Sequence, residues 1–203
     1  MSGLTIVGAV LADQAQLPPI SALGYEYVVA ANGLFIRAED SRLEARIPIV
    51  LADLHGLEPV TSFARLKPPR IPAAFLWAVL KSARAALPSE EAYQFCWDAA
   101  EGRWRCRKPG QVASAFAVEY ADDGAAVVDL HSHNTMPAFY SATDDGDEQG
   151  FRFYLVAGCV EAARPEIRAR VGVYGHHWPV AVTAIFDGLG PFREVEIEPG
   201  ACP

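Results

Sequence analysis

One stretch of this chain has the periodicity of an amphipathic helix, whereas most of the remainder has strand-like patterns. Between Pro72 and Leu87 the apolar side chains recur at helical spacing, and Pro88 ends the pattern. Pro72 suits the first helical turn, where its missing N–H costs no hydrogen bond. One clear helix among many strands predicts an α+β fold, because the helix must bury its apolar side against a sheet. We therefore expect a mixed, mainly antiparallel sheet with flanking helices.

Strands are expected on both sides of this helix. The Asn32-Gly33 pair separates two β-rich segments, which is a strong hairpin pattern. The stretch Lys67-Pro-Pro-Arg70 interrupts the chain and predicts a boundary between a small β-rich extension, residues 1–66, and a second domain, residues 67–203. The expected strands cover residues 5–11 (short and buried), 25–30, 34–38, 45–51, 92–97, 103–107, 113–120, 125–130, 151–160, 167–174, 180–186 and 193–197.

Composition limits the classes of partner. Hydrophobic residues make up 51% and charged residues 21% of the 203 residues, the usual balance of a globular protein. The net charge of −8 disfavours direct binding of nucleic acid or of an anionic membrane. No basic leader precedes the apolar residues near the start, and no apolar run is long enough for a membrane helix, so we expect a cytoplasmic protein. The oligomeric state stays open.

The cysteines give no sign of a zinc ribbon or a dense disulfide framework. They contain no CxxC pair, and we expect free thiols in a reducing compartment, although two of them could face each other across a hairpin. The four residues are Cys96, Cys106, Cys159 and Cys202, of which the first two are the hairpin pair.

Two histidines follow the apolar strand at residues 125–130. His131 and His133 are two residues apart, so in a continuing strand both imidazoles point to the same face. Asp144 comes after the next loop and offers a carboxylate. Two imidazoles and one carboxylate leave one position of a tetrahedral zinc ion open for water, which is typical of a catalytic site. We predict that these three residues hold Zn2+.

Simpler interpretations exist for each part of this pattern. Two histidines on a strand are often hydrogen-bonded core residues, and Ser141-x-x-Asp144 alone resembles a helix capping box. The acidic run 144–148 lacks the layout of a calcium loop. The adjacent pair His176-His177 points to opposite faces of a strand and cannot easily share one ion, so a structural role is favoured for it.

Taken together, the segment resembles a known family. His131-Ser132-His133, seven residues, Ser141, two residues and Asp144 are similar to the HxH-x7-SxxD motif of the JAMM (MPN-plus) zinc metalloisopeptidases. The resemblance implies a JAMM/MPN fold with cytidine-deaminase-like layering, and a glutamate general base on the strand after the long helix. Glu91 is preferred because it leads the run Ala-Tyr-Gln-Phe-Cys-Trp, and Glu90 is the alternative. The hydroxyl of Ser141 is suited to stabilise the oxyanion of the reaction.

The resemblance covers residues 71–186 and includes two departures. Asn134 stands where many members have proline, and the segment after Asp144 is too short and glycine-broken for the long helix often found there. The amino-acid sequence of this motif is most similar to that of the PRTRC branch of the family. This branch belongs to a plasmid- and island-borne gene set with ubiquitin-pathway-like members.

The activity implied by the resemblance is hydrolysis of a peptide or isopeptide bond at the C-terminal tail of a ubiquitin-like protein. A non-catalytic MPN scaffold is the alternative, but scaffold members typically lack ligands that this chain retains. A third hypothesis, a DNA-processing protein of a mobile element, conflicts with the acidic charge.

Overall fold

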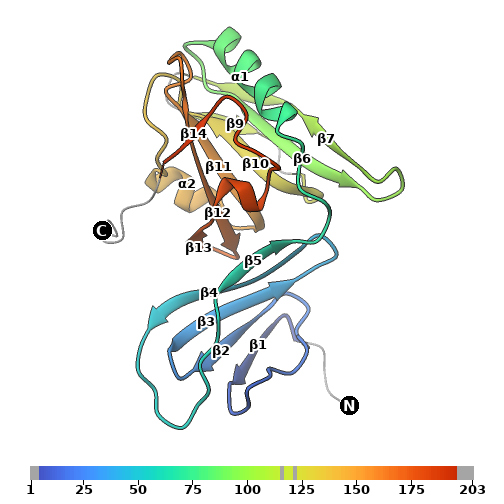
Figure 1. Cartoon of the computed structure of the whole chain (residues 1–203), viewed down its shortest axis with the longest axis vertical. Helices are drawn as coiled ribbons and strands as arrows, with labels where there is room; N and C mark the ends of the chain where they lie inside the picture. The colour runs from blue at the N-terminus through green and yellow to red at the C-terminus, as the bar shows by residue number, and fades with distance from the viewer. Residues whose placement is uncertain (1–4, 115–116, 121–122, 196–203) are drawn as a thin grey trace.

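The computed structural model describes residues 5–114, 117–120 and 123–195 (Figure 1). Two main sheets, a small hairpin and two α-helices form a mixed, mainly antiparallel α+β fold, as the sequence predicts. In the part of the chain that the structure describes, no helix has the length and apolar character needed to cross a membrane.

The N-terminal sheet has five strands in chain order, with β1 parallel to β2 and the others antiparallel. The predicted hairpin is confirmed: Gly33 has a φ of 138°, and a Cβ there would lie 2.1 Å from the carbonyl oxygen of Val50. The prediction that β1 is buried is wrong, because it is an edge strand in which Val7 is 42% and Leu11 57% exposed. The strands are β1 (Val7–Leu11), β2 (Tyr25–Ala30), β3 (Gly33–Glu39), β4 (Leu43–Leu51) and β5 (Phe63–Leu66).

The C-terminal sheet has seven strands, six of them in the order β13-β12-β11-β10-β6-β7, with β14 paired to β12. Among its described strands, β10 with β11 and β12 with β14 are the parallel pairs. The strands are β6 (Ala92–Asp98), β7 (Arg103–Arg107), β10 (Ala126–Ser132), β11 (Phe151–Gly158), β12 (Glu166–Val173), β13 (His176–Pro179) and β14 (Arg193–Glu194).

The predicted helix is α1 (Ala74–Ala86), which lies across one face of this sheet (Figure 1). Its side facing the sheet buries Leu76, Val79, Leu80 and Ala83. The helix has no side-chain cap of its own, but Asp187 accepts a hydrogen bond of 2.6 Å from the backbone N–H of Ala73. A carboxylate at this end also suits the positive end of the helix dipole.

Two predicted strands have a different structure. The expected strand 113–120 is a hairpin of β8 (Gln111–Ala113) and β9 (Val118–Tyr120), with residues 115–116 outside the described part. The expected strand 180–186 contains a 3-10 turn, η1 (Val182–Ala184). Val182, Ile185 and Phe186 are all buried. Residues three and four positions apart lie on the same side of a helical turn, whereas a strand directs residues three apart to opposite faces.

Strand β5 of the N-terminal sheet lies outside the expected strands, and further discrepancies are at the edges of the C-terminal sheet. Strand β13 pairs with β12 and begins at His176, between the expected strands 167–174 and 180–186. The last expected strand shortens to β14, and residues 196–197 lie outside the described part.

The three described cysteines are free, and Cys202 lies outside the described residues. Cys96 is opposite Arg105 and Cys106 is opposite Phe95 in the β6–β7 ladder. The two thiols therefore point to opposite faces of the sheet and do not face each other.

The two sheets share one hydrophobic core. Ile36, Leu43 and Ile47 of the N-terminal sheet belong to the same buried cluster as the apolar side of α1. The ring of Tyr25 stacks on that of Tyr174, in the β12–β13 turn, with centroids 4.9 Å apart. The N-terminal sheet is thus packed against the end of the C-terminal sheet where this hairpin lies (Figure 1).

A buried ion pair stabilises the N-terminal sheet. The carboxylate of Glu26 accepts hydrogen bonds from the backbone and side chain of Ser21, from Ala22 and from the guanidinium of Arg37, with its shortest contact at 2.6 Å. Burial raises the pKa of Glu26, but the Ser21 amide and Arg37 outweigh it and lower the pKa below 4.5. The ionised form is therefore favoured in the folded protein.

We expect Glu26→Gln to lower the free energy of unfolding by about 3 kcal/mol, because it leaves the buried Arg37 without its counter-charge. The matched control is Glu39→Gln, which breaks the exposed ion pair with Lys67. We expect this change to lower the free energy of unfolding by about 1 kcal/mol or less. Urea titrations measure both. A depressed pKa gives stability that is present above pH 4.5 and lost as the pH falls through the folded value, so the wild type and Glu26→Gln should converge in acid. Equal effects of the two substitutions would contradict this account.

Candidate metal centre

His131 and His133 lie at the carboxyl end of β10, the central strand of the C-terminal sheet. Every residue of β10 is buried, between β6 on one side and β11 on the other. The alternation of side chains directs both imidazoles to the face opposite α1, where their Nε2 atoms are 3.1 Å apart. The backbone N–H of His133 donates to the carbonyl oxygen of Ala157, which fixes the end of the strand against β11.

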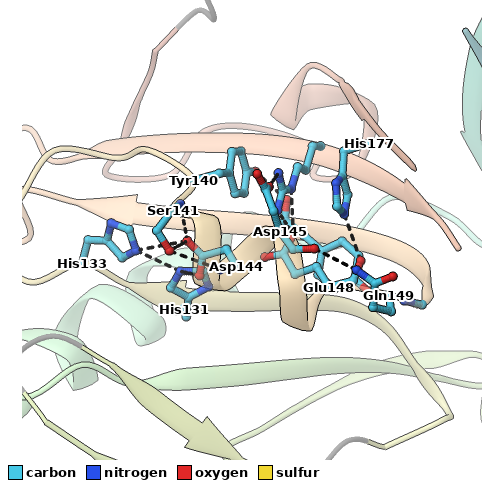
Figure 2. A network of polar contacts seen from close by, with 12 residues as sticks. His131, His133, Tyr140, Ser141, Asp144, Asp145, Glu148, Gln149 and His177 are labelled. Atoms are coloured by element: carbon cyan, nitrogen blue, oxygen red, sulfur yellow. Dashed lines mark hydrogen bonds and ion pairs between the residues drawn. The ribbon is translucent and has the colours of Figure 1, made fainter. Parts of the chain in front are cut away.

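Asp144 lies in the first turn of α2 (Ala142–Asp147), on the same face. A capping box holds it: the N–H and the hydroxyl of Ser141 donate to its Oδ2 at 2.6 and 2.7 Å, and its own N–H donates to the Ser141 hydroxyl. Its Oδ1 lies 3.2 Å from Nε2 of His131, and its Oδ2 lies 3.9 Å from Nε2 of His133 (Figure 2). The three side chains converge, as the sequence predicts.

The three donor atoms have the spacing of a metal site. They all lie within 4.8 Å of one another. The ligand atoms of a tetrahedral zinc ion are about 3.3 Å apart, so the donor atoms are already close to the spacing that a bound ion requires. Burial lowers the pKa of both histidines, against the opposing charge of Asp144, so the imidazoles are neutral near pH 7. Neutral imidazole is the form that binds a metal. The group could therefore hold a divalent cation with little rearrangement.

A hollow of about 250 Å³ opens in front of these side chains, and Glu90 lines it together with His131, His133 and Asp144. Strand register explains the position of Glu90. His131 is opposite Ala92, so the residue two before Ala92 shares the face of the histidines. Burial first, and the charge of Asp144 second, raise the pKa of Glu90 to about 7.

Glu91 lies on the other face of the sheet, beneath α1. Its carboxylate accepts hydrogen bonds from Ser82 of α1, Tyr93 and Lys108. Burial opposes ionisation, but these partners, Lys108 first, lower the pKa of Glu91. The preference for Glu91 as the glutamate of the site is therefore corrected: the structure places Glu90 in the pocket and Glu91 in a structural ion pair.

The loop from His133 to Ser141 is held close to the sheet. Gly158 allows this, because a Cβ there would lie 2.2 Å from the backbone nitrogen of Ala138. The N–H of Ala138 donates to Glu166 at 3.0 Å. The loop between the second histidine and the capping serine is thus fixed by packing and by a buried carboxylate.

Asn134 accounts for one departure from the family pattern. It has a φ of 50°, a left-handed conformation that asparagine tolerates and that the ring of proline forbids. Its side-chain amide donates to the carbonyl oxygen of Pro88 at 2.8 Å. The residue therefore links the histidine loop to the segment that leads to Glu90.

Ser141 and the paired histidines have defined structural contacts. The hydroxyl of Ser141 borders the hollow and donates to Asp144, so Ser141 is the N-cap of α2 as well as a pocket residue.

The two adjacent histidines of β13 have separate contacts. The ring of His176 packs edge-on against Tyr27, whereas Nε2 of His177 lies 2.9 Å from the carbonyl oxygen of Glu148. The two histidines point to opposite faces, as predicted.

Comparison with known proteins agrees with this geometry. Residues 72–171 match the family model for prokaryotic homologs of the JAB domain. The chain contains a JAB/MPN-type domain. The match begins just before α1 and ends in β12, so it includes both histidines, Asp144 and Glu90. No curated protein matches the chain.

We expect Gly158→Ala to lower the free energy of unfolding by about 1–3 kcal/mol, because the added methyl group meets the backbone of residues 136–138. Gly110→Ala is the control, since a Cβ there meets nothing within 4 Å, and its effect should stay within about 0.5 kcal/mol. Urea denaturation compares the two. A neutral Gly158→Ala would contradict the close approach of this loop to β11.

Proposed function

We propose that this protein is a zinc-dependent hydrolase that cleaves a peptide or isopeptide bond. The observation that supports this most strongly is the convergence of His131, His133 and Asp144 in a pocket that also contains a buried carboxylate, Glu90. Two imidazoles and a carboxylate are a zinc ligand set that leaves a position open for water. The JAB/MPN family, which includes hydrolases, adds independent support.

The catalytic roles follow from where each group lies. Zinc, when bound by the three ligands, would lower the pKa of a water molecule and polarise the carbonyl of the scissile bond. Glu90 is the group that accepts the proton of the attacking water and passes it to the leaving amine. Burial and the charge of Asp144 raise the pKa of Glu90 to about 7 while no metal is bound, and a bound cation would lower it again, towards the ionised form that accepts a proton.

Ser141 has two roles in this proposal. As the N-cap of α2 it orients Asp144, through the contacts from its N–H and hydroxyl to Oδ2. Its hydroxyl also borders the pocket, and we assign it the stabilisation of the oxyanion. The second role requires this hydroxyl to donate to the substrate in place of Asp144.

For the substrate we propose the C-terminal tail of a ubiquitin-like protein, as precursor or conjugate. Strand β9 supports an extended substrate, because Val118, Glu119 and Tyr120 line the hollow, and among the described strands β9 pairs only with β8. An extended tail could add to the free edge of β9 through main-chain hydrogen bonds. Membership of the PRTRC branch, with its ubiquitin-pathway-like neighbours, remains part of this proposal, as does a cytoplasmic location.

The alternative is a non-catalytic MPN-type scaffold. Such a scaffold needs neither three converging ligands nor a buried carboxylate in the same pocket. It would also leave unexplained why Glu90 is kept at 3% exposure, with no lysine or arginine among the described residues that line the hollow. The enzyme accounts for these features directly.

Glu90→Gln and Glu91→Gln test the proposal as a matched pair of neighbouring isosteric changes. We expect Glu90→Gln to slow hydrolysis by about 100-fold or more, because it removes the proton acceptor, while its zinc content stays that of the wild type. Glu91→Gln should retain most of the activity and lose stability instead, because it weakens the contact with Lys108. The assay is cleavage of a panel of C-terminally extended ubiquitin-like proteins by zinc-loaded protein, followed by mass spectrometry.

Two outcomes would count against the proposal. Cleavage by Glu90→Gln at the wild-type rate would remove Glu90 from the mechanism. Absence of cleavage by a zinc-loaded wild type across the panel would contradict the proposed substrate class.

A further inference from the structure

The helix that carries Asp144 lacks the usual means of attachment to a sheet. Helix α2 has six residues, and none of them is buried. A helix this short is not stable by itself, and most helices are stabilised by burying an apolar side. The capping box fixes Asp144 relative to Ser141, but it does not attach the helix to the strand with the histidines. Another contact must determine where the third ligand lies.

Arg170 of β12 makes that contact. Its Nε donates to Oε2 of Glu148 at 2.7 Å, and its NH1 donates to Oδ1 of Asp145 at 2.5 Å. Asp145 follows the metal ligand directly, and Glu148 is the residue after the last turn of the helix. The planar guanidinium thus contacts α2 within the helix, at Asp145, and at its C-cap, Glu148, a fork geometry that lysine cannot reproduce.

The surroundings of Arg170 make the attachment rigid. Its side chain is 7% exposed, and its guanidinium carbon lies 3.8 Å from the centre of the Tyr140 ring, which precedes the capping serine. The hydroxyl of Tyr140 donates to the carbonyl oxygen of Tyr154 at 2.9 Å. Figure 2 shows Tyr140, Asp145 and Glu148 gathered beside Asp144, with His177 reaching Glu148 from the other side.

We propose that Arg170 is the positioning residue of the metal centre: it fixes α2 on the sheet and so places Asp144 at bonding distance from a metal held by His131 and His133. The inference rests on the metal site proposed above. Arg170 does not touch the metal ligands' donor atoms, so its effect is on metal affinity through the geometry of Asp144. Replacing a residue that orients the metal ligands without binding the metal itself typically changes the metal affinity 10–100-fold.

Arg152 of β11 provides a matched control. It is also a buried arginine on the same face of the sheet, 8% exposed at its side chain, and its NH1 donates to Asp129 at 2.7 Å. Asp129 belongs to β10 and not to α2. Losing Arg152 therefore removes a buried ion pair that joins β11 to β10, whereas losing Arg170 removes the ion pairs to Asp145 and Glu148.

The experiment is zinc affinity by competition with a chromophoric chelator, on the full chain, for wild type, Arg170→Met, Arg170→Lys and Arg152→Met. We expect Arg170→Met to bind zinc 10–100-fold more weakly, Arg170→Lys to lie between it and the wild type, and Arg152→Met to stay within about threefold of the wild type. The visible spectrum of Co2+ bound in place of zinc should change in Arg170→Met and not in Arg152→Met. Thermal unfolding identifies any variant that does not fold.

A second pair of variants keeps the test valid if Arg170→Met fails to fold. Asp145→Asn removes one Arg170 contact at a side chain that is 58% exposed. Asp147→Asn makes the same charge change on the same helix, and the ion pairs of Arg170 among the described residues are with Asp145 and Glu148 instead. We expect the Asp145 change to weaken zinc binding several-fold more than the Asp147 change. In a folded Arg170→Lys background this extra loss should shrink, as for groups that act through one contact.

The outcomes separate this inference from the proposed function. If the wild type binds no zinc, the metal site itself is wrong. If the wild type binds zinc and a folded Arg170→Met binds it equally well, or if Arg152→Met loses as much affinity, the positioning role is wrong while the metal site stands. Equal effects of Asp145→Asn and Asp147→Asn would also contradict it.

Discussion

The alternation of side chains along β10 governs the arrangement of the whole C-terminal sheet. The strand is buried on both faces, and its apolar residues set its position between β6 and β11. Because successive side chains point to opposite faces, Ser132 turns towards α1 and its hydroxyl accepts from the N–H of Glu91, while His131 and His133 turn away from α1. A shift of register by one residue would exchange these two environments completely.

The two faces consequently have different chemistry. Beneath α1, Glu91 is paired with Lys108, Ser82 and Tyr93 and stabilises the packing of the helix. On the opposite face, two neutral imidazoles converge with the carboxylate of Asp144, a group that could bind a metal, and Arg170 contacts the helix that carries this carboxylate. The N-terminal sheet packs against the β12–β13 hairpin, and β12 is the strand that contributes this arginine.

The sequence predicted the elements that depend on local patterns. The α1 helix, the Asn32-Gly33 hairpin and the two histidines on one face all follow from periodicity or turn chemistry within a few residues. The choice between Glu90 and Glu91 depends on the register of β6 against β10, which is set by long-range packing, so local pattern could not decide it. Knowing that Ala92 is opposite His131 would have been enough. The role of Arg170 depends on contacts with residues 22 and 25 positions away in sequence, and no local motif indicates it.

Metal content tests most directly whether His131, His133 and Asp144 form a zinc site. Plasma mass spectrometry on the folded wild type, supplied with zinc and then freed of excess metal, should find close to one zinc per chain. His133→Ala and Asp144→Ala, each shown to be folded, should lose it. A folded wild type that retains no zinc, or variants that retain it fully, would contradict the account and leave the scaffold as the better explanation of this fold.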